Sequence, residues 1–445
     1  IIDNVPNHVA RNYISVSKPK HVSDFGENDD VTKSFTPKNN FYYLPGQPLE
    51  IQFRPGSISE HKYKEFPAKV TGNDSFTNKP TPNDWYDTVK LNYGVNYMNY
   101  KEEWFNPIPD TWNKMKDILM YWADKDVDGF RCDMAEMVPI AFWRWAIPQI
   151  KAKYPEFIFI AEIYNPSMYR EYIDKNCFDY LYDKVGLYDV LRDVSCGYRP
   201  SSDITFTLNN VGDIQKKMLN FMENHDEQRV ASEYFCGDAR KGIPALIVSA
   251  LIGRNPFMVY FGQELGEAGM DKEGFSGRDG RTTIFDYWSL DKIQRGYFDR
   301  RHMTNEEKAI QLKYQQILRI ANREKAVCEG EFFDLMYVNP QSWKFNPRSQ
   351  FAFLRKYKEQ VLLVVANFSQ DRVNLGITIP EHAFDTLQLT EGDVEAMDLL
   401  TGEELPLTMT KDGMVNMDIK AFSGRIFKFS IKMEAMDYSF NDHNK

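Results

Sequence analysis

The pattern of apolar and polar positions predicts an alternation of helices and strands from about residue 105 to residue 324. Apolar side chains recur at helical spacing in the longer segments, and short, mainly apolar runs lie between them. Such short runs are typical of strands in a parallel sheet that is buried on both faces. The helices are predicted at 108–125, 139–153, 243–253 and 305–324, and the strands at 127–133, 157–162, 178–181, 218–223 and 256–261.

Two segments of different texture flank this alternation. Residues 11–104 are rich in Pro, Asn and Lys, which predicts a loop-rich inserted domain and not a packed helical layer. Beyond residue 327, alternating runs such as Phe351–Arg355 and Gly424–Ser430 are separated by turn signals, which predicts an antiparallel β-sandwich. The expected parts are the end of a buried strand at 1–10, the inserted domain at 11–104, the region of alternating helices and strands at 105–327 and a C-terminal sandwich at 328–445.

Composition narrows the classes of function. The net charge of −10 comes without a Lys/Arg-rich face, which argues against nucleic acid as a partner. The longest apolar stretch, 243–261, is broken by Arg254, Asn255 and Pro256 and therefore predicts no membrane span. The five cysteines lack metal-type spacing and are expected to be free and buried. Aromatic residues make up 14%, which fits core packing and also a groove that stacks on sugar rings.

Three carboxylates lie where predicted strands end. Asp133 ends one strand, Glu162 ends the next, and Asp226 follows the strand at 218–223. In a parallel βα barrel, active-site residues lie at the carboxyl ends of the strands. Cleavage of a glycosidic bond with retention requires a carboxylate nucleophile and a carboxylic acid that protonates the leaving oxygen, about 5–5.5 Å apart. Arg131 is expected to hold Asp133 ionised, and the apolar run before Glu162 is expected to keep that acid protonated.

Four segments occur in a fixed order along the chain. They are Asp3-Asn4-Val5-Pro6-Asn7-His8, Gly129-Phe130-Arg131-Cys132-Asp133, Ala161-Glu162 and Phe221-Met222-Glu223-Asn224-His225-Asp226. Together they resemble the signature segments of the α-amylase superfamily of glycoside hydrolases. Gly262-Gln263-Glu264-Leu265-Gly266 and Tyr86-Asp87-Thr88-Val89-Lys90-Leu91-Asn92 resemble two further segments of that family. The resemblance covers essentially the whole chain and implies a (β/α)8 TIM barrel with an inserted loop-rich domain and a C-terminal antiparallel β-sandwich.

The same resemblance implies a role for each matching residue. Asp133 would be the nucleophile that forms a glycosyl-enzyme, and Glu162 would act first as general acid and then as general base. Asp226 would bind sugar hydroxyls and stabilise the oxocarbenium-like transition state. The other implied roles are hydrogen bonds to the sugar from His8 and His225, orientation of the nucleophile by Arg131, and a structural acid at Asp3.

Calcium is the cofactor that the resemblance implies, and no organic cofactor is expected. Asn7 matches a calcium ligand of many family members. Because calcium takes six to eight oxygen ligands, further ligands are required. Asp24, Asp29 and Asp30 of the inserted segment are candidates, although acidic loop residues are more often simply solvated.

Two features depart from the family pattern. Glu136 and Met137 stand where α-amylases have Lys-His, so starch itself is a less secure substrate than some α-glucoside. Asp3 lies at the exit of what would be the third barrel strand, so we expect on the order of 60–100 further residues ahead of it. A targeting signal would lie in that segment, which leaves the compartment open, with the resemblance slightly favouring an extracytoplasmic site.

Three functions fit these observations. The first is retaining hydrolysis of α-glucosidic bonds in malto-oligosaccharides or starch-type α-glucans. The second is a transglycosylase that uses the same carboxylates, favoured by the changed pair Glu136-Met137. The third is a non-catalytic carbohydrate-binding homologue, which is disfavoured because such proteins typically lose catalytic carboxylates. Linkage preference, endo or exo action and oligomeric state are left open by the sequence.

Overall fold

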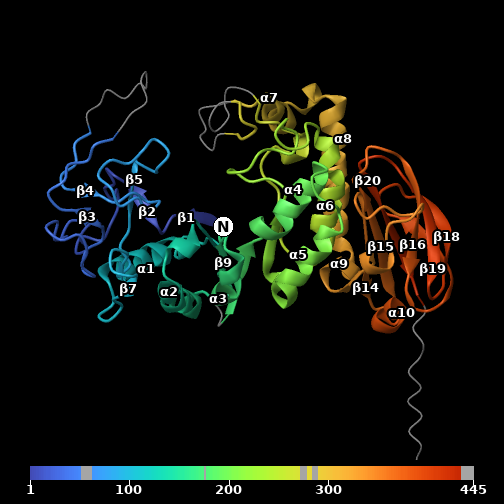
Figure 1. The fold of residues 1–445 in the computed structure, drawn as a ribbon, viewed down its shortest axis with the longest axis horizontal. Helices are drawn as coiled ribbons and strands as arrows, with labels where there is room; N and C mark the ends of the chain where they lie inside the picture. Colours follow the sequence, from blue (N-terminus) through green and yellow to red (C-terminus); the bar gives the residue numbers. More distant parts are fainter. Residues whose placement is uncertain (52–62, 175–176, 271–277, 283–288, 432–445) are drawn as a thin grey trace, which may run out of the picture. The chain divides into compact units, whose positions relative to one another are not determined.

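The structure of the protein is a computed structural model, and it describes residues 1–51, 63–174, 177–270, 278–282 and 289–431. These residues form two compact units, Ile1–Tyr182 and Asp183–Lys445 (Figure 1). The predicted inserted, barrel and sandwich ranges each include some residues outside the described part of the chain.

A parallel sheet organises the first unit. Its strands lie in the order β1, β8, β9 and β10, and Asp3 of β1 is paired with Arg131 of β8. A Cβ at Gly129 would lie 2.3 Å from the carbonyl oxygen of Ile158, so glycine permits the close approach of β8 to β9. The strand bounds are β1 Ile2–Asn4, β8 Gly129–Cys132, β9 Ile158–Ala161 and β10 Tyr180–Tyr182.

Helices α1 and α2 of the first unit pack together through aromatic side chains. Trp112 of α1 lies 5.7 Å from Phe142 of α2, measured between ring centroids, and donates a hydrogen bond from Nε1 to the carbonyl of Tyr93. Trp143 is fully buried and donates to the carbonyl of Ala135, in the turn that follows β8. The helix bounds are α1 Asp110–Ala123, α2 Ile140–Lys153 and α3 Tyr169–Ile173, close to the predicted helices at 108–125 and 139–153.

The inserted segment between β1 and α1 contains short antiparallel strand pairs. β2 pairs with β5, β3 with β4, and β6 with β7. These pieces are only two or three residues long, and loops joined by side-chain hydrogen bonds lie between them. Their bounds are β2 His8–Ala10, β3 Tyr43–Leu44, β4 Ala68–Lys69, β5 Thr88–Lys90, β6 Val95–Asn96 and β7 Glu102–Glu103.

The second unit begins with helices around one parallel strand pair, β11 with β12. β12 is shorter than the strand predicted at 256–261, because the backbone of Tyr260 onward turns into Gly262, whose φ is +78°. Thr304 and Glu307 form a reciprocal capping box at the start of α8. The bounds are α4 Asp189–Ser195, α5 Asp203–Val211, β11 Met218–Phe221, α6 Ile243–Leu251, β12 Phe257–Met258, α7 Asp291–Ile293, α8 Asn305–Arg323 and α9 Lys325–Cys328.

The predicted antiparallel strands follow in the same unit. One sheet has the order β13, β14, β15, β20, β17, β18, and a second consists of β16 and β19. Helix α6 packs against β15 and β20 (Figure 1). The bounds are β13 Glu331–Asp334, β14 Gln350–Tyr357, β15 Gln360–Asn367, β16 Val373–Ile379, α10 Glu381–Leu387, β17 Gly392–Asp398, β18 Glu404–Met409, β19 Gly413–Ile419 and β20 Ser423–Ser430.

A buried arginine ties these strands to the helices of the unit. Arg355 of β14 donates to the carbonyl oxygens of Ala326, Val327, Gly330 and Ile252 at 2.8–3.0 Å. Burial lowers the pKa of Arg355 to about 10. The guanidinium is held by neutral carbonyl dipoles, and these hydrogen bonds join the helices to the sheet.

Asp183 is a buried carboxyl at the start of the second unit. Its side chain accepts a hydrogen bond from the backbone N–H of Leu187 at 2.7 Å. Burial, with a smaller contribution from the charge of the nearby Asp189, raises the pKa of Asp183 to about 6, although the hydrogen bond from Leu187 acts in the opposite direction. A raised pKa means that the folded state binds this proton more tightly than the unfolded chain does. The resulting stabilisation is complete below about pH 4 and is lost as the pH rises through about 6.

We therefore expect Asp183→Asn to gain stability relative to the wild type as the pH rises from 4 to 7.5. The upper limit of this relative gain is about 3 kcal/mol, from about two pKa units. Urea unfolding of both proteins across that range measures it. Asp371→Asn, at an exposed position, serves as the control. A difference between Asp183→Asn and the wild type that does not change with pH would contradict the prediction.

Candidate active site

Arg131 gathers three carboxylates at the carboxyl end of the first unit's sheet. Its Nη1 donates to Asp133 Oδ1 at 2.8 Å and to both oxygens of Asp3 at 3.0 and 3.2 Å. Its Nη2 forms an ion pair with Glu162 Oε1 at 2.7 Å. The predicted contact of Arg131 with Asp133 is thus present, and the two predicted catalytic carboxylates of this unit are bound to one guanidinium.

The electrostatic balance at Arg131 favours its charged form. Burial by itself disfavours a charged guanidinium. Attraction to Glu162 is the largest opposing effect, followed by Tyr182, Asp3 and Asp133, and the net result is a raised pKa for Arg131. The guanidinium carbon also lies 5.5 Å from the ring centroid of Tyr182. Arg131 is therefore a permanent positive charge between the carboxylates.

Glu162 is buried, but its surroundings are polar. Besides Arg131, the hydroxyl of Tyr164 donates to Oε1 at 2.5 Å and the backbone N–H of Met134 donates to Oε2 at 2.9 Å. The apolar setting predicted from the preceding run Phe159–Ala161 is therefore wrong. That run is buried within β9, whereas Glu162 follows the strand and meets residues from other parts of the chain.

The turn after Asp133 connects the two acids. The backbone N–H of Asp133 donates to the carbonyl of Asn4 at 2.9 Å. Met134 follows with φ at +44°, a left-handed conformation that is uncommon for a residue with a side chain. In this conformation the N–H of Met134 reaches the Glu162 carboxylate. Such backbone strain is concentrated at functional sites in proteins.

Asn7 and His8 follow β1 in the first unit, and His8 is the first residue of β2. The ring of His8 lies 5.2 Å from that of Trp85, and burial, then the charge of Lys90, lowers the pKa of His8. Asn7 Nδ2 lies 3.3 Å from His8 Nδ1 and donates to the carbonyl of Gly72 at 2.7 Å. Asn7 Oδ1, the atom that would bind calcium, accepts a hydrogen bond from Lys90 Nζ at 2.8 Å.

His225 and Asp226 belong to the second unit, in the loop after β11. His225 Nε2 lies 3.2 Å from Asp226 Oδ2. The buried Asn224 shapes this loop, because its Oδ1 accepts from the backbone N–H groups of Asp226 and Glu227, both at 2.9 Å. His225 and Asp226 therefore lie together on a turn that the buried side chain of Asn224 holds in place.

A second buried pair supports the same loop. Glu223 and Arg229 are almost completely buried, and Arg229 Nη1 donates to Glu223 Oε2 at 2.8 Å. Glu223 Oε1 accepts from the N–H of Val230, while Arg229 Nη2 donates to Thr282 Oγ1. Burial raises the pKa of Glu223, and Arg229 opposes that shift. The segment from Glu223 to Val230 is therefore closed by a desolvated ion pair.

Glu136 explains part of the departure from the family pattern. Its carboxylate accepts from the backbone N–H groups of Tyr164 and Asn165 at 3.2 and 3.1 Å. It therefore holds the loop that follows Glu162. This contact and the contacts of Tyr164 and Tyr182 with the site were not among the predictions made from the sequence. A usable signal existed for Tyr164, since it stands two residues after Glu162 at a strand exit.

The chain has the features of the α/β-barrel enzymes. These are parallel strands with carboxylates at their exits, an inserted segment and antiparallel C-terminal strands. The family model described as "Alpha amylase, catalytic domain" matches residues 1–326, and the chain belongs to this α-amylase family. Neopullulanase 2 of Thermoactinomyces vulgaris is 21% identical over 324 residues, which are 72% of this chain and 48% of that protein. An alpha-1,4-glucan:maltose-1-phosphate maltosyltransferase of Cereibacter sphaeroides is 28% identical over 107 residues, 24% of this chain and 16% of that protein.

Solved structures support the fold. The alpha-amylase of Geobacillus thermoleovorans in complex with acarbose has a TM-score of 0.55 at 16% identity, covering 80% of this chain and 68% of that chain. The maltogenic alpha-amylase AmyB of Thermotoga neapolitana has a TM-score of 0.53 at 18% identity, covering 80% and 71%. The predicted fold class, a TIM barrel with a C-terminal β-sandwich, is confirmed. The chain spans about half the length of Neopullulanase 2.

No helix among the described residues combines the length and the apolar composition that a membrane span requires. All five cysteines have free thiols, as predicted. The predicted burial is confirmed for Cys132, Cys177 and Cys236 and is wrong for Cys196 and Cys328, which are partly exposed.

Proposed function

We propose that this chain cleaves α-glucosidic bonds of malto-oligosaccharides or starch-type α-glucans with retention of configuration. The observation that carries the proposal is the single guanidinium of Arg131 bound to both Asp133 and Glu162. A retaining glycosidase needs two carboxyl groups of different function on either side of one bond. We assign these two roles to Asp133 and Glu162, which one buried cation holds at neighbouring strand exits.

In the proposed reaction, Asp133 attacks the anomeric carbon while the bond to the leaving oxygen breaks. Glu162 gives its proton to that oxygen, and a covalent glycosyl-enzyme forms on Asp133. Glu162 then removes a proton from water, which displaces Asp133 and releases the sugar with its original configuration. Arg131 remains in contact with Asp133 and Asp3 during this step. Tyr164 stays as a hydrogen-bond partner of the acid.

The remaining residues receive supporting roles in the proposal. Arg131 keeps the nucleophile ionised and oriented, because a charge-assisted hydrogen bond stabilises the carboxylate form. His8 and His225 are assigned hydrogen bonds to sugar hydroxyls. Asp226 is assigned stabilisation of the positive charge that develops on the sugar ring, in keeping with the family resemblance of its segment.

Transfer to a sugar acceptor is the second candidate function. It is supported by Glu136, which stands with Met137 where α-amylases carry a different pair of residues. The carboxylate of Glu136 accepts hydrogen bonds from the loop after Glu162. The name of one relative, a maltosyltransferase, also describes transfer. Both functions use the same glycosyl-enzyme and differ in whether water or a sugar hydroxyl attacks it.

Product analysis on maltoheptaose separates the two functions. For hydrolysis we expect only shortened oligosaccharides and one new reducing end for each bond broken. Transfer would instead produce oligosaccharides longer than the substrate without an increase in reducing ends. Chromatography of the products, together with a reducing-end assay, measures both quantities. No change in the maltoheptaose pool would count against either form of catalysis.

A further inference from the structure

Lys90 places a buried positive charge next to the candidate site. It ends β5 directly opposite His8 of β2, and only 1% of its side chain is exposed. Its Nζ lies 2.6 Å from Asp74 Oδ1 and 2.8 Å from Asn7 Oδ1, and 5.1 Å from the ring centroid of Tyr97. A lysine is almost never this buried unless its charge is paired, so the ammonium group and these oxygens form one unit.

The contacts of Lys90 fix the orientation of the Asn7 side-chain amide. An ammonium group only donates, so the atom facing Lys90 must be the amide oxygen. A carbonyl only accepts, so the atom facing the Gly72 carbonyl must be the amide nitrogen. The same nitrogen faces His8 Nδ1 at 3.3 Å. His8 Nδ1 is therefore the acceptor, and in the neutral ring the proton lies on Nε2.

We propose that the ammonium group of Lys90 is the structural cation of this site, in place of the calcium ion that the family resemblance implies at Asn7. Lys90 binds Asn7 and Asp74 and, through Asn7, orients the ring of His8. Lys90 is thus a positioning residue. The contact of His8 with a sugar rests on the proposed function, whereas the assignment of the cation does not.

The residues around Asn7 do not fit calcium. That ion takes six to eight oxygens at about 2.3–2.6 Å. Asn7 Oδ1 already has the Lys90 ammonium group at contact distance, so an ion there would place two positive charges side by side. Among the residues that the structure describes, no group of three or more His, Cys, Asp or Glu side chains is arranged to hold a metal ion.

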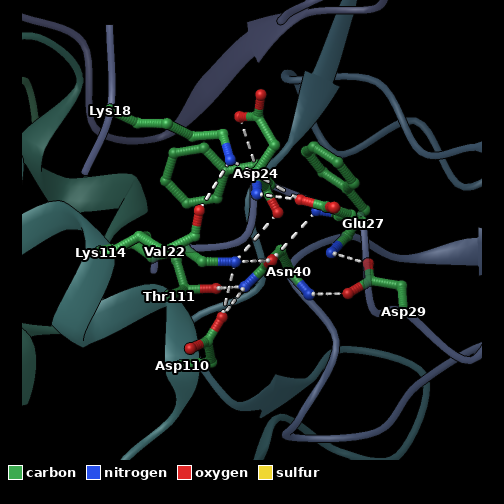
Figure 2. A network of polar contacts seen from close by, with 12 residues as sticks. Lys18, Val22, Asp24, Glu27, Asp29, Asn40, Asp110, Thr111 and Lys114 are labelled. Atoms are coloured by element: carbon green, nitrogen blue, oxygen red, sulfur yellow. Dashed lines mark hydrogen bonds and ion pairs between the residues drawn. The ribbon is translucent and has the colours of Figure 1, made fainter. Parts of the chain in front are cut away.

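Lys114 repeats this arrangement elsewhere in the first unit (Figure 2). Its Nζ lies 3.0 Å from the carbonyl of Asp24, 2.9 Å from Asn40 Oδ1 and 2.8 Å from Asp110 Oδ2. An ammonium group therefore occupies the point where oxygens of a loop and of α1 converge.

The acids that the sequence offered as calcium ligands are bound to protein donors. Asp24 Oδ2 accepts from the N–H of Ser15 at 2.9 Å. Asp29 accepts from the N–H groups of Asn40 and Phe41 at 2.7 and 3.0 Å. Asp30 Oδ1 accepts from the N–H and the hydroxyl of Thr32 at 3.1 and 2.5 Å. In this proposal, these contacts and the two lysines take the place of a metal ion in the part of the inserted segment that the structure describes.

Calcium titration of the wild-type full chain tests the cation assignment. The expected result is the same midpoint of thermal unfolding in EGTA and in millimolar calcium, and no saturable heat in calorimetry with calcium chloride. Stoichiometric calcium binding that raises the midpoint would overturn the proposal. This measurement does not depend on turnover, so it remains decisive if the chain proves inactive on glucans.

Substitution of Lys90 provides the second arm. We expect Lys90→Ala to lower the midpoint by about 5–10 °C, and calcium to restore part of the loss by binding the freed oxygens of Asn7 and Asp74. Lys90→Arg, which keeps the charge, is expected to lose less. Lys79→Ala, which breaks an exposed ion pair with Glu50, is the matched control and should leave the midpoint unchanged. A Lys90→Ala midpoint equal to that of the wild type would overturn the proposal.

The positioning role has its own readout. In the ¹⁵N spectrum of histidine-labelled wild type, His8, assigned with a His8→Asn variant, should carry its proton on Nε2. A proton on Nδ1 would exclude the relay through Asn7. This spectrum requires neither the Lys90 variants nor a substrate.

Discussion

Asp133→Ala and Glu162→Ala are expected to lose turnover of maltoheptaose by about three orders of magnitude or more, because each removes one of the two groups that the bond cleavage requires. The two variants should nevertheless differ in the presence of azide. With an activated substrate such as 4-nitrophenyl α-maltoside, the leaving group departs without a general acid. Azide then acts as an external nucleophile, and the species that it attacks differs between the two variants.

The configuration of the azide product identifies each role. In Asp133→Ala no glycosyl-enzyme forms, so azide attacks the substrate directly and a single inversion gives the β-glycosyl azide. In Glu162→Ala the glycosyl-enzyme still forms on Asp133 and azide then displaces it, so two inversions give the α-glycosyl azide. NMR of the product distinguishes the two anomers.

Asp117→Ala, which changes an exposed carboxylate of α1, is the control and should retain wild-type turnover. Circular dichroism must show that all three variants are folded. Unchanged turnover in Asp133→Ala would remove Asp133 from its assigned role. An α-glycosyl azide from Asp133→Ala would show that another group is the nucleophile.

Arg229→Leu is expected to destabilise the second unit by about 3–5 kcal/mol, because it leaves the carboxylate of Glu223 buried without its partner. The guanidinium also lies 4.2 Å from the ring centroid of Tyr260, so the substitution removes a cation–π contact as well. The loss should shrink as the pH falls. The pKa of Glu223 is already raised by burial and rises further without Arg229, and the protonated acid carries no buried charge.

Urea unfolding of the full chain at several pH values measures this effect. Arg240→Leu is a matched control, since Arg240 pairs with Asp238 at 2.5 Å but 68% of its side chain is exposed, and an exposed pair contributes about 0–1 kcal/mol. The double variant Arg229→Leu/Glu223→Leu should be less destabilised than Arg229→Leu alone, because it leaves no buried charge. Equal losses in Arg229→Leu and Arg240→Leu would contradict the importance of burial here.

The strand exits could be predicted because they depend on local patterns. Apolar runs mark the buried strands, and Asp133 and Glu162 directly follow β8 and β9 as the sequence indicated. The carboxyl ends of parallel strands lie at the same edge of a sheet. The proximity of Asp133 and Glu162 could therefore be predicted from the two strand patterns alone. Element ends were less accurate, and β12 in particular proved shorter than its apolar run.

The surroundings of the site residues could not be predicted in the same way. The apolar run before Glu162 suggested an apolar environment, yet Arg131 and Tyr164 contact the carboxylate. Side chains that follow a strand meet partners from other strands and loops, and sequence neighbours say little about them. The weak segment Tyr86–Asn92 already contained Lys90, but no local pattern indicated that its charge would be buried against Asn7.

The sequence by itself determined the family, the fold class and which acids stand at the strand exits, because these depend on motifs and on the periodicity of apolar residues. The tertiary structure decided which charges meet. Lys90 reaches Asn7 across 83 residues of chain, and Arg131 reaches Asp3 across 128. The physical reason is that electrostatic partners are set by distance and burial in space, and both arise only when separate segments of the chain pack together.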